Sequence, residues 1–283
     1  DAMRSSLNAK QKVNKFSLLI VLAIFVLILG FPIVVTILTS LKSTSEVYTI
    51  PATWIPKDFL FRNYLEIFSK LDLLSALKSS IIVSISSALL TVIAALPAGY
   101  ALARFHFFGR RFLLTAILAG LMFSPVVVLI SIYQILSTVG LMNTYFALIL
   151  PNTAFALPFS IWLTMAYVKS LPTEIDESAV LDGAGYSRIL FTIVTPLIAP
   201  SVVTVFVYAF IQSWNEFLFS KTFITSESLK TLPVRLYEFV GYRGIEWQYM
   251  TASIVVTTVP CIILFFSVQR WLVKGLVSGA VRG

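Results

Sequence analysis

The chain has 283 residues, of which 58% are hydrophobic and 12% are charged, and its mean hydropathy is +0.91. No ordinary soluble domain is this apolar, so the composition excludes the soluble classes and indicates an integral membrane protein. The net charge of +8 is better explained by basic flanks that face anionic lipid than by binding to nucleic acid. The single cysteine, Cys261, excludes an internal disulfide, and the single histidine, His106, cannot by itself form a metal site.

Residues 1–15 form a polar arm with four basic side chains, and the following stretch 16–41 carries no charge. A bilayer core of about 30 Å requires about 20 apolar residues in a helix, so this stretch is expected to span it. The stretch is longer than the apolar core of a cleaved signal peptide, which favours a permanent anchor. Residues 42–78 are expected to form a loop that contains a short helix near Arg62–Ser69.

Residues 79–103 form a second uncharged run and are expected to span the membrane. Phe112–Val168 also contains no charged residue, and one helix of that length would overshoot a bilayer at about 1.5 Å per residue. We therefore expect two spans, 112–136 and 145–168, which are joined by a turn at Gly140–Thr144. The prolines inside these spans predict irregular helices.

The last two expected spans are 189–214 and 250–269, which are separated by a polar loop and followed by a tail at 270–283. Six spans place both termini on the same side of the membrane. The N-terminal arm, the loop 104–111 and the tail are basic, which indicates that this side is the cytoplasm. The predicted fold class is therefore an all-α polytopic membrane protein, with residues 16–283 forming one transmembrane domain.

The most acidic segment of the chain, Pro172–Pro196, lies between the fourth and fifth expected spans. Thr173 can cap a helix here, with Asp176 in the capping-box position three residues later. Gly183 is expected to end this helix and Ser187 to cap the next one, which enters the membrane. An acidic cytoplasmic loop gains nothing from anionic lipid, so we expect it, residues 172–188, to dock on a basic protein surface. The alternative is a solvated helix whose acidic first turn only satisfies the helix dipole.

The register of a few residues within this segment is specific. Glu177-Ser178-Ala179 is followed by Gly183 and then by Ile193-Val194-Thr195-Pro196. This pattern resembles the loop motif of permeases in binding-protein-dependent ABC importers, in which E-A-A precedes G and I-x-L-P at the same spacing. Two positions depart from the family pattern, since Ser178 stands for alanine and Thr195 stands for leucine.

The resemblance implies the fold of a type I ABC importer permease, with a coupling helix that sits in a cleft of a separate ATPase subunit. Glu177 matches the motif glutamate, which implies contact with a basic residue of the ATPase. Gly183 has no Cβ and would let the chain turn sharply against that partner. The residues expected to couple to the ATPase are Glu174, Asp176, Glu177, Ser178, Ala179, Asp182 and Gly183.

Further motifs resemble the carbohydrate-importer branch of this family, above all Trp214-Asn215-Glu216-Phe217 and the tail that follows Gln269. The residues that this resemblance places on the solute pathway or the binding-protein side are Trp214, Asn215, Glu216, Pro233 and Gly241. The residues that it places against the ATPase are Gly275, Gly279, Ala280, Val281, Arg282 and Gly283. An interfacial tryptophan, a surface glutamate and a frayed terminus are the alternatives for these segments.

The sequence contains no phosphate-binding loop, no H-E-x-x-H motif and no Cys/His cluster, so we expect a non-catalytic subunit without a metal. The resemblance implies that ATP and Mg bind a homodimeric ATPase rather than this chain. The other implied partners are a second homologous permease, an extracytoplasmic sugar-binding protein and membrane lipid, with no nucleic acid. The implied location is the bacterial cytoplasmic (inner) membrane, and the implied solute is a sugar, a di- or oligosaccharide.

Three alternatives remain open on the sequence alone. An ABC permease for a non-sugar solute is the nearest of them. A stand-alone secondary transporter would need paired ionisable residues inside its spans, whereas the expected spans carry no charge. A non-transporting membrane scaffold would need no coupling motif.

Overall fold

The computed structural model describes residues 2–241 and 244–280, and it describes side chains over 18–70, 72–240 and 244–269. These residues fall into two compact units. The first unit comprises Asp1–Lys70 and Phe239–Val256, and the second comprises Leu71–Glu238 and Thr257–Gly283. One helix, α14 (Trp247–Ala280), begins in the first unit and continues into the second.

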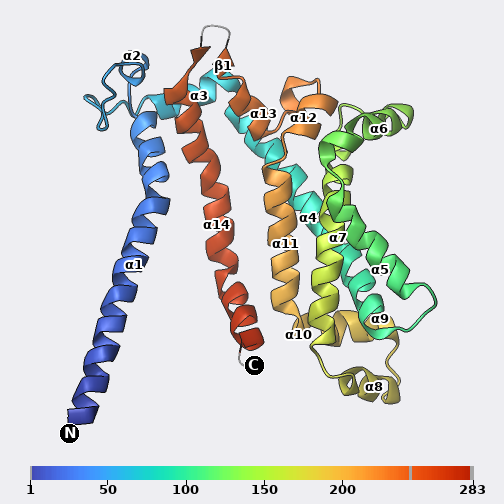
Figure 1. The fold of residues 1–283 in the computed structure, drawn as a ribbon. Helices are drawn as coiled ribbons and strands as arrows, with labels where there is room; N and C mark the ends of the chain where they lie inside the picture. Colours follow the sequence, from blue (N-terminus) through green and yellow to red (C-terminus); the bar gives the residue numbers. More distant parts are fainter. Residues whose placement is uncertain (1, 242–243, 281–283) are drawn as a thin grey trace. The chain divides into compact units, whose positions relative to one another are not determined.

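The first unit contains α1 (Ala2–Ser40) and α3 (Asn63–Leu71) (Figure 1). The apolar side chains of α1 from Leu18 onward, where side chains are described, are mostly exposed. The side chain of Asn63 holds the end of α1, because its Nδ2 donates to the carbonyl oxygens of Ser40 at 2.9 Å and Lys42 at 3.0 Å. Carbonyl groups in the last turn of a helix lack partners within that helix. A side chain 23 residues away therefore ends α1.

The rest of the first unit forms a cap of short elements. α2 (Thr44–Val47) follows α1, and β1 (Val240–Gly241) pairs with β2 (Gly244–Ile245) in an antiparallel pair. Tyr249, near the start of α14, donates its hydroxyl group to Glu66 of α3. These contacts give order to the expected loop 42–78, which contains α2 and α3 and whose residues from Leu73 onward belong to α4.

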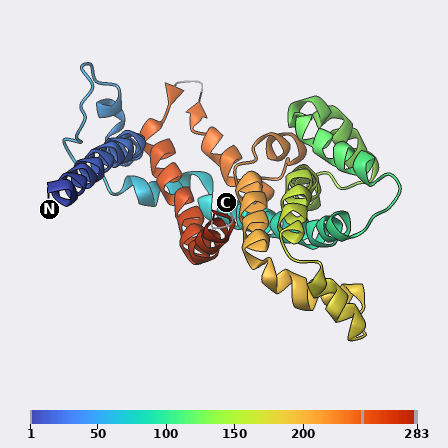
Figure 2. The same ribbon diagram turned by 60° about the horizontal axis from the view of Figure 1, so that its bottom comes forward.

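The second unit is built on three helices that lie side by side (Figures 1 and 2), α4 (Leu73–Arg104), α7 (Phe146–Lys169) and α11 (Ala199–Trp214). Small side chains on α4 let the neighbouring backbones approach closely, as is common between helices in membranes. The buried small residues of α4 include Ala76, Ser79, Ser80, Ser84, Ser87, Ala88, Thr91, Ala95 and Gly99. The expected second span is thus one helix, and it begins at Leu73 rather than at Ser79.

The third expected span, 112–136, is broken in two. α5 (Arg110–Ala119) and the short helix η1 (Gly120–Met122) meet α6 (Pro125–Thr138) at a bend of 102°. Ser124 has an extended backbone, with φ −74° and ψ 135°, because the ring of the following proline disfavours the helical conformation. The irregularity that the proline predicts is therefore a complete break and not a kink.

The fifth expected span, 189–214, is also broken. α9 (Tyr186–Arg188), the π-helix η2 (Ile189–Val194) and α10 (Thr195–Leu197) meet α11 at a bend of 85°. Two prolines, Pro196 and Pro200, flank this bend, and neither has an amide hydrogen to continue a helix. The prediction that 189–214 forms one continuous span is therefore wrong, because the helix is broken at this bend.

Among the residues described, four helices are long and apolar enough to cross a membrane, and they are Leu18–Ser40, Leu73–Arg104, Phe146–Lys169 and Trp247–Gln269. The two bent pairs raise this number to six if each is one span. The expected loop after α11 contains α12 (Leu218–Phe223), η3 (Glu227–Leu229) and α13 (Leu232–Tyr237). The structure confirms the all-α class.

Candidate coupling site

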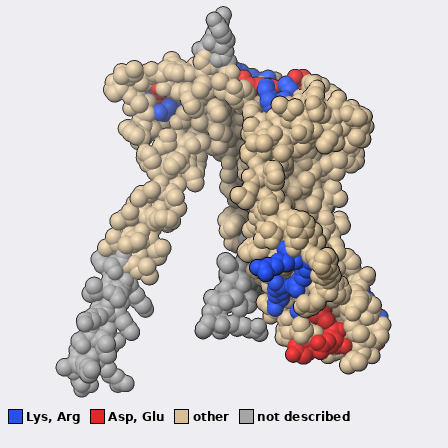
Figure 3. Space-filling view, turned by 45° about the vertical axis from the view of Figure 1, so that its right-hand side comes forward, with Lys and Arg blue, Asp and Glu red and all other residues tan. Residues whose placement is uncertain are grey.

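The acidic segment forms α8 (Glu174–Leu181), a short helix that follows α7 at an exposed end of the second unit (Figure 1). Figure 3 shows Asp and Glu side chains gathered at this end, beside a group of Lys and Arg side chains. The first turn carries Glu174, Asp176 and Glu177, where free amide groups and the helix dipole favour negative charge. The expected surface helix is therefore present.

The expected cap at the start of α8 is not formed. Thr173 lies at the N-terminal flank with helical angles, φ −71° and ψ −24°, and its side chain makes no capping hydrogen bond. Asp176 does not reach back to the flank, because its carboxylate binds Tyr100 and Arg104 of α4 instead. The capping-box prediction is wrong, since a buried ion pair competes successfully for the same side chain.

The end of α8 follows the expectation for Gly183. Its φ is 81°, its amide donates to the carbonyl oxygen of Val180 at 3.0 Å, and the amide of Ala184 donates to Ala179 at 2.9 Å. These two hydrogen bonds form a Schellman motif, in which a glycine with positive φ closes the helix. Ser187 does not cap the next helix, because α9 already begins at Tyr186.

The residues of this segment that are expected to couple to the ATPase face two directions. Asp176 and Ala179 are buried within the second unit, whereas Glu174, Glu177, Ser178 and Asp182 are exposed, as is Gly183. The sequence analysis missed Leu181, whose side chain is 88% exposed. Helical spacing places positions 174, 177, 178 and 181 on one face, so the period of the sequence could have found it. We call these four residues the exposed stripe of α8.

The segment after α11 is held by local contacts. Trp214 is buried and stacks on Phe210, with ring centroids 5.4 Å apart, and Asn215 Nδ2 donates to the carbonyl oxygen of Ile211 at 3.0 Å. Glu216 accepts hydrogen bonds from the amides of Phe219 at 2.5 Å and Ser220 at 3.1 Å, which caps the start of α12. Burial raises the pKa of Glu216 above its ordinary value of 4.5, although these backbone hydrogen bonds lower it.

Pro233 occupies the first turn of α13, where its missing amide hydrogen costs nothing. Next to it, a charge network joins Arg235 and Lys230 to Glu227 and Glu238, with ion-pair distances of 2.5–3.0 Å. The hydrogen bond between Lys230 and Glu227 is the main cause of two shifts, since it raises the pKa of Lys230 and lowers the pKa of Glu227. This network joins η3 to α13.

The remaining predicted residues can be placed only in part. Gly241 lies in β1 of the first unit, and its backbone pairs with Gly244. Gly275, Gly279 and Ala280 belong to α14 by their backbone, but their side chains lie outside the described residues. Val281, Arg282 and Gly283 lie wholly outside them.

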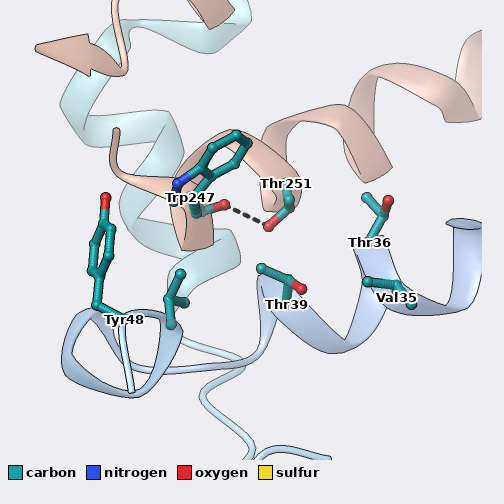
Figure 4. A pocket seen from close by; sticks show the side chains of 7 residues that line it. Val35, Thr36, Thr39, Tyr48, Trp247 and Thr251 are labelled. Atoms are coloured by element: carbon teal, nitrogen blue, oxygen red, sulfur yellow. Dashed lines mark hydrogen bonds between the residues drawn. The ribbon is translucent and has the colours of Figure 1, made fainter. Parts of the chain in front are cut away.

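A cavity of about 390 Å³ in the first unit is the hollow shown in Figure 4, and it is lined by Val35, Thr36, Thr39, Val47, Tyr48, Trp247 and Thr251. Three of its four hydroxyl groups have backbone partners, and two of these are Thr36, which donates to Pro32, and Thr251, which donates to Trp247. Tyr48 donates to the carbonyl oxygen of Ile245. The cavity therefore offers a largely apolar surface to an occupant.

Among the residues that the structure describes, no three or more His, Cys, Asp or Glu side chains lie together as a metal site. His106 is exposed in the loop between α4 and α5. What distinguishes this chain chemically is thus the acidic helix α8 and its attachment to α4.

The fold and this helix define a polytopic α-helical membrane protein with an acidic connecting helix between its spans. The model of the family described as binding-protein-dependent transport system inner membrane component matches residues 95–278. The chain belongs to this family, and it is therefore a membrane permease component of an ABC transport system.

Relatives cover the chain over nearly its whole length. The trehalose/maltose transport system permease protein MalG of Thermococcus litoralis is 33% identical over 278 residues, which cover 97% of this chain and 99% of the relative. The sulfoquinovosyl glycerol transport system permease protein SmoH of Agrobacterium fabrum is 34% identical over 253 residues, which cover 89% of this chain and 89% of the relative. A chain in the crystal structure of a bacterial ABC transporter that imports the polysaccharide alginate superposes with a TM-score of 0.76 at 21% identity, over 92% of this chain and 97% of that one.

Proposed function

We propose that this chain is the transmembrane subunit of an ATP-driven importer for a sugar, a di- or oligosaccharide delivered by an extracytoplasmic binding protein. The observation that carries this proposal is α8, an acidic helix with an outward stripe of side chains in a chain of the binding-protein-dependent permease family. Relatives named for trehalose, maltose and sulfoquinovosyl glycerol support a carbohydrate.

In this proposal α8 lies on the cytoplasmic side, as do both termini, in the bacterial inner membrane. The basic arm, the loop 104–111 and the tail support that orientation. ATP and Mg bind a separate homodimeric ATPase, and a second homologous permease completes the membrane part. Glu174 and Glu177 are exposed, so both are free to meet a basic partner surface.

The exposed stripe of α8 suits insertion into a cleft of the ATPase. Leu181 supplies an apolar knob at one end, and the carboxylates of Glu174 and Glu177 supply charge at the other. An apolar anchor surrounded by polar groups is the usual form of an energetic centre in a protein interface. When the ATPase closes on ATP, it would move α8, and the spans would open a path for the sugar.

The test is a tagged pull-down of this chain from native membranes, followed by an ATPase assay of the purified complex. The proposal expects one ATPase, one second permease and a binding protein that stimulates ATP hydrolysis when loaded with maltose or trehalose. A single species without ATPase activity would contradict it. Stimulation by a non-sugar solute alone would keep the permease class and overturn the carbohydrate assignment.

Two variants locate the contact. Leu181→Glu and Glu177→Arg should reduce the co-purified ATPase by roughly tenfold or more, because losing a central anchor costs about 2 kcal/mol. Asp58→Arg is the matched control, since Asp58 is exposed in the segment between α1 and α3 and the charge change is the same. Equal retention of the ATPase by all three variants would remove α8 from the contact.

A further inference from the structure

The side chain of Arg104, the last residue of α4, reaches the segment that leads into α8 at three points. Its Nη1 donates to the carbonyl oxygen of Leu171 at 3.2 Å, and its Nη2 donates to that of Pro172 at 3.3 Å. Nη2 also lies 2.9 Å from Oδ2 of Asp176 in α8. The planar guanidinium group presents several donors in fixed directions, which the single ammonium of a lysine cannot do.

Tyr100 lies one turn before Arg104 on the same face of α4 and donates its hydroxyl group to Oδ1 of Asp176 at 2.6 Å. The two carboxylate oxygens of Asp176 therefore face two side chains of one helix. Tyr100 is 3% exposed, and the side chains of Arg104 and Asp176 are 8% and 12% exposed. We call these three residues the α4–α8 anchor.

The anchor is not arranged for the greatest stability. Oδ2 of Asp176 has no hydrogen-bond partner among the described residues, so its contact with Nη2 of Arg104 is an ion pair without hydrogen-bond geometry. Nε of Arg104 also has no hydrogen-bond partner among these residues. A buried ion pair adds little net stability compared with apolar side chains of similar size, but removal of one partner leaves a buried charge unpaired. Its placement between two helices therefore indicates a role in position rather than in stability.

Apolar contacts attach the other end of α8 to the same region. Ala179 belongs to a buried cluster that includes Tyr100 of α4 and Ile189 of the π-helix η2. Phe105, directly after α4, makes an edge-to-face contact with Tyr186, with ring centroids 5.0 Å apart. Polar contacts thus fix the first turn of α8, and apolar contacts fix its last turn, both against the end of α4.

We propose that Tyr100, Arg104 and Asp176 are positioning residues that make α8 and α4 one rigid body, so that displacement of α8 is passed to the full length of α4. This inference rests on the proposed function, in which an ATPase moves α8. It also assigns Asp176 a role different from that of its neighbours in the first turn. Glu174 and Glu177 face a partner, whereas Asp176 faces the chain's own span.

The test measures the distance between two spin labels in the assembled transporter. The labels are placed at Leu74→Cys, at the far end of α4, and at Val180→Cys on α8, since both side chains are exposed, in a Cys261→Ser background. The complex is measured without nucleotide and with Mg and the non-hydrolysable analogue AMP-PNP. In the labelled complex without any anchor substitution, which is called the unsubstituted complex below, we expect one narrow distance. AMP-PNP should leave this distance unchanged, because a rigid body keeps its internal distances.

Anchor variants should break this constancy. Arg104→Gln and Asp176→Asn should broaden the distance distribution, and AMP-PNP should shift its centre by more than about 3 Å, which is half a helical turn. The milder variants Tyr100→Phe and Arg104→Lys should broaden it less, and they guard against loss of folding. Arg104→Gln and the double variant Arg104→Gln/Asp176→Asn should give the same shift, because the effects of residues that act as a unit are not additive.

Arg110→Gln is the matched control. Arg110 also binds the end of α4, where its Nε donates to the carbonyl oxygen of Leu102 at 2.9 Å, but among the described residues no hydrogen bond or ion pair joins its side chain to α8. This variant should keep the narrow, constant distance. A stability effect alone would lower the yield of each variant without shifting the distance in the complex that assembles.

The outcomes separate the two proposals. If the unsubstituted chain purifies without an ATPase, the proposed function fails. If the complex assembles and its label distance changes with AMP-PNP, or if the four anchor variants all keep a constant distance, only the rigid-body inference is overturned. A constant distance in the unsubstituted complex and a shift in Arg104→Gln and Asp176→Asn support it.

Discussion

A Cβ atom added to Gly99 of α4 would lie 2.7 Å from the Cβ atom of Thr164 on α7. The backbone of Met165 lies 3.0 Å from the same point, so the neighbour cannot yield by a side-chain rotation alone. The Gly99→Ala variant should therefore force α4 and α7 apart and destabilise the protein by about 1–3 kcal/mol, the usual cost of overpacking. The midpoint of thermal unfolding in detergent measures this loss.

Gly30→Ala is the control for this variant. Gly30 is a helical glycine of α1, and nothing lies within 4 Å of its added Cβ atom. This change should leave the midpoint unchanged or raise it slightly, because alanine favours a helix over glycine. If both variants unfold at the midpoint of the unsubstituted protein, the close approach of α4 and α7 is not as tight as the structure has it.

A second prediction concerns Gly183, where a larger residue is disfavoured by the left-handed backbone conformation and not by lack of space. Its φ is 81°, and nothing lies within 4 Å of an added Cβ atom. Gly183→Ala should therefore destabilise the end of α8 by about 1 kcal/mol, the cost of a left-handed conformation, and Gly183→Asn should cost less. Hydrogen exchange of the peptide 174–185 should be about fivefold faster in Gly183→Ala. This factor corresponds to about 1 kcal/mol, because about 1.4 kcal/mol corresponds to a factor of ten. Equal exchange in Ala and Asn variants would contradict the strain argument.

The sequence predicts features that depend on local chemistry. An uncharged run long enough to cross a bilayer becomes a helix whatever surrounds it, so α4 and α7 were within reach. The same holds for Gly183 at the end of α8 and for the turn at Gly140–Thr144, because a glycine with positive φ ends a helix by its own geometry. The helical period also predicts that Leu181 shares the exposed face of α8 with positions 174, 177 and 178.

Features that depend on distant partners were beyond the sequence. The partners of Asp176 are 72 and 76 positions away, and nothing in the local pattern distinguishes it from a capping residue. The prolines near the two bends predict irregularity, but the bend angle depends on how α6 and α11 pack against the core. The structure therefore moves Asp176 from the exposed group into the anchor.

A third prediction concerns Glu216 and pH. Burial raises its pKa above 4.5, so the folded protein holds the proton more tightly than the unfolded chain does. The contribution of Glu216 to stability should therefore fall as pH rises from 4.5 through the raised pKa, and it should be constant above that range. Unfolding midpoints of the unsubstituted protein and of Glu216→Gln, compared at each pH from about 4 to 8, isolate this effect. A difference that stays flat or grows with pH would show that the backbone hydrogen bonds outweigh burial.

The fourth prediction concerns Asn143, which joins the turn between α6 and α7 to the segment after α12. Its Oδ1 accepts hydrogen bonds from the amides of Thr225 at 3.0 Å and Ser226 at 2.8 Å, and its Nδ2 donates to Ser226 Oγ at 2.7 Å. Its φ is 59°, a left-handed conformation that asparagine tolerates better than most residues. Backbone conformation and side-chain bonding therefore both favour asparagine here.

Three substitutions at position 143 separate these two contributions. Asn143→Asp keeps the acceptor for both amides and reverses the bond to Ser226, whose hydroxyl group can donate to the second carboxylate oxygen, so it should cost at most about 1 kcal/mol. Asn143→Gly keeps the backbone conformation but loses all three hydrogen bonds. Asn143→Ala loses the bonds and also strains the backbone, so it should be destabilised by about 1–2 kcal/mol more than Asn143→Gly. Unfolding midpoints should fall in the order Asn, Asp, Gly, Ala, and a midpoint for Gly at or below that for Ala would show that φ at this position adds no strain.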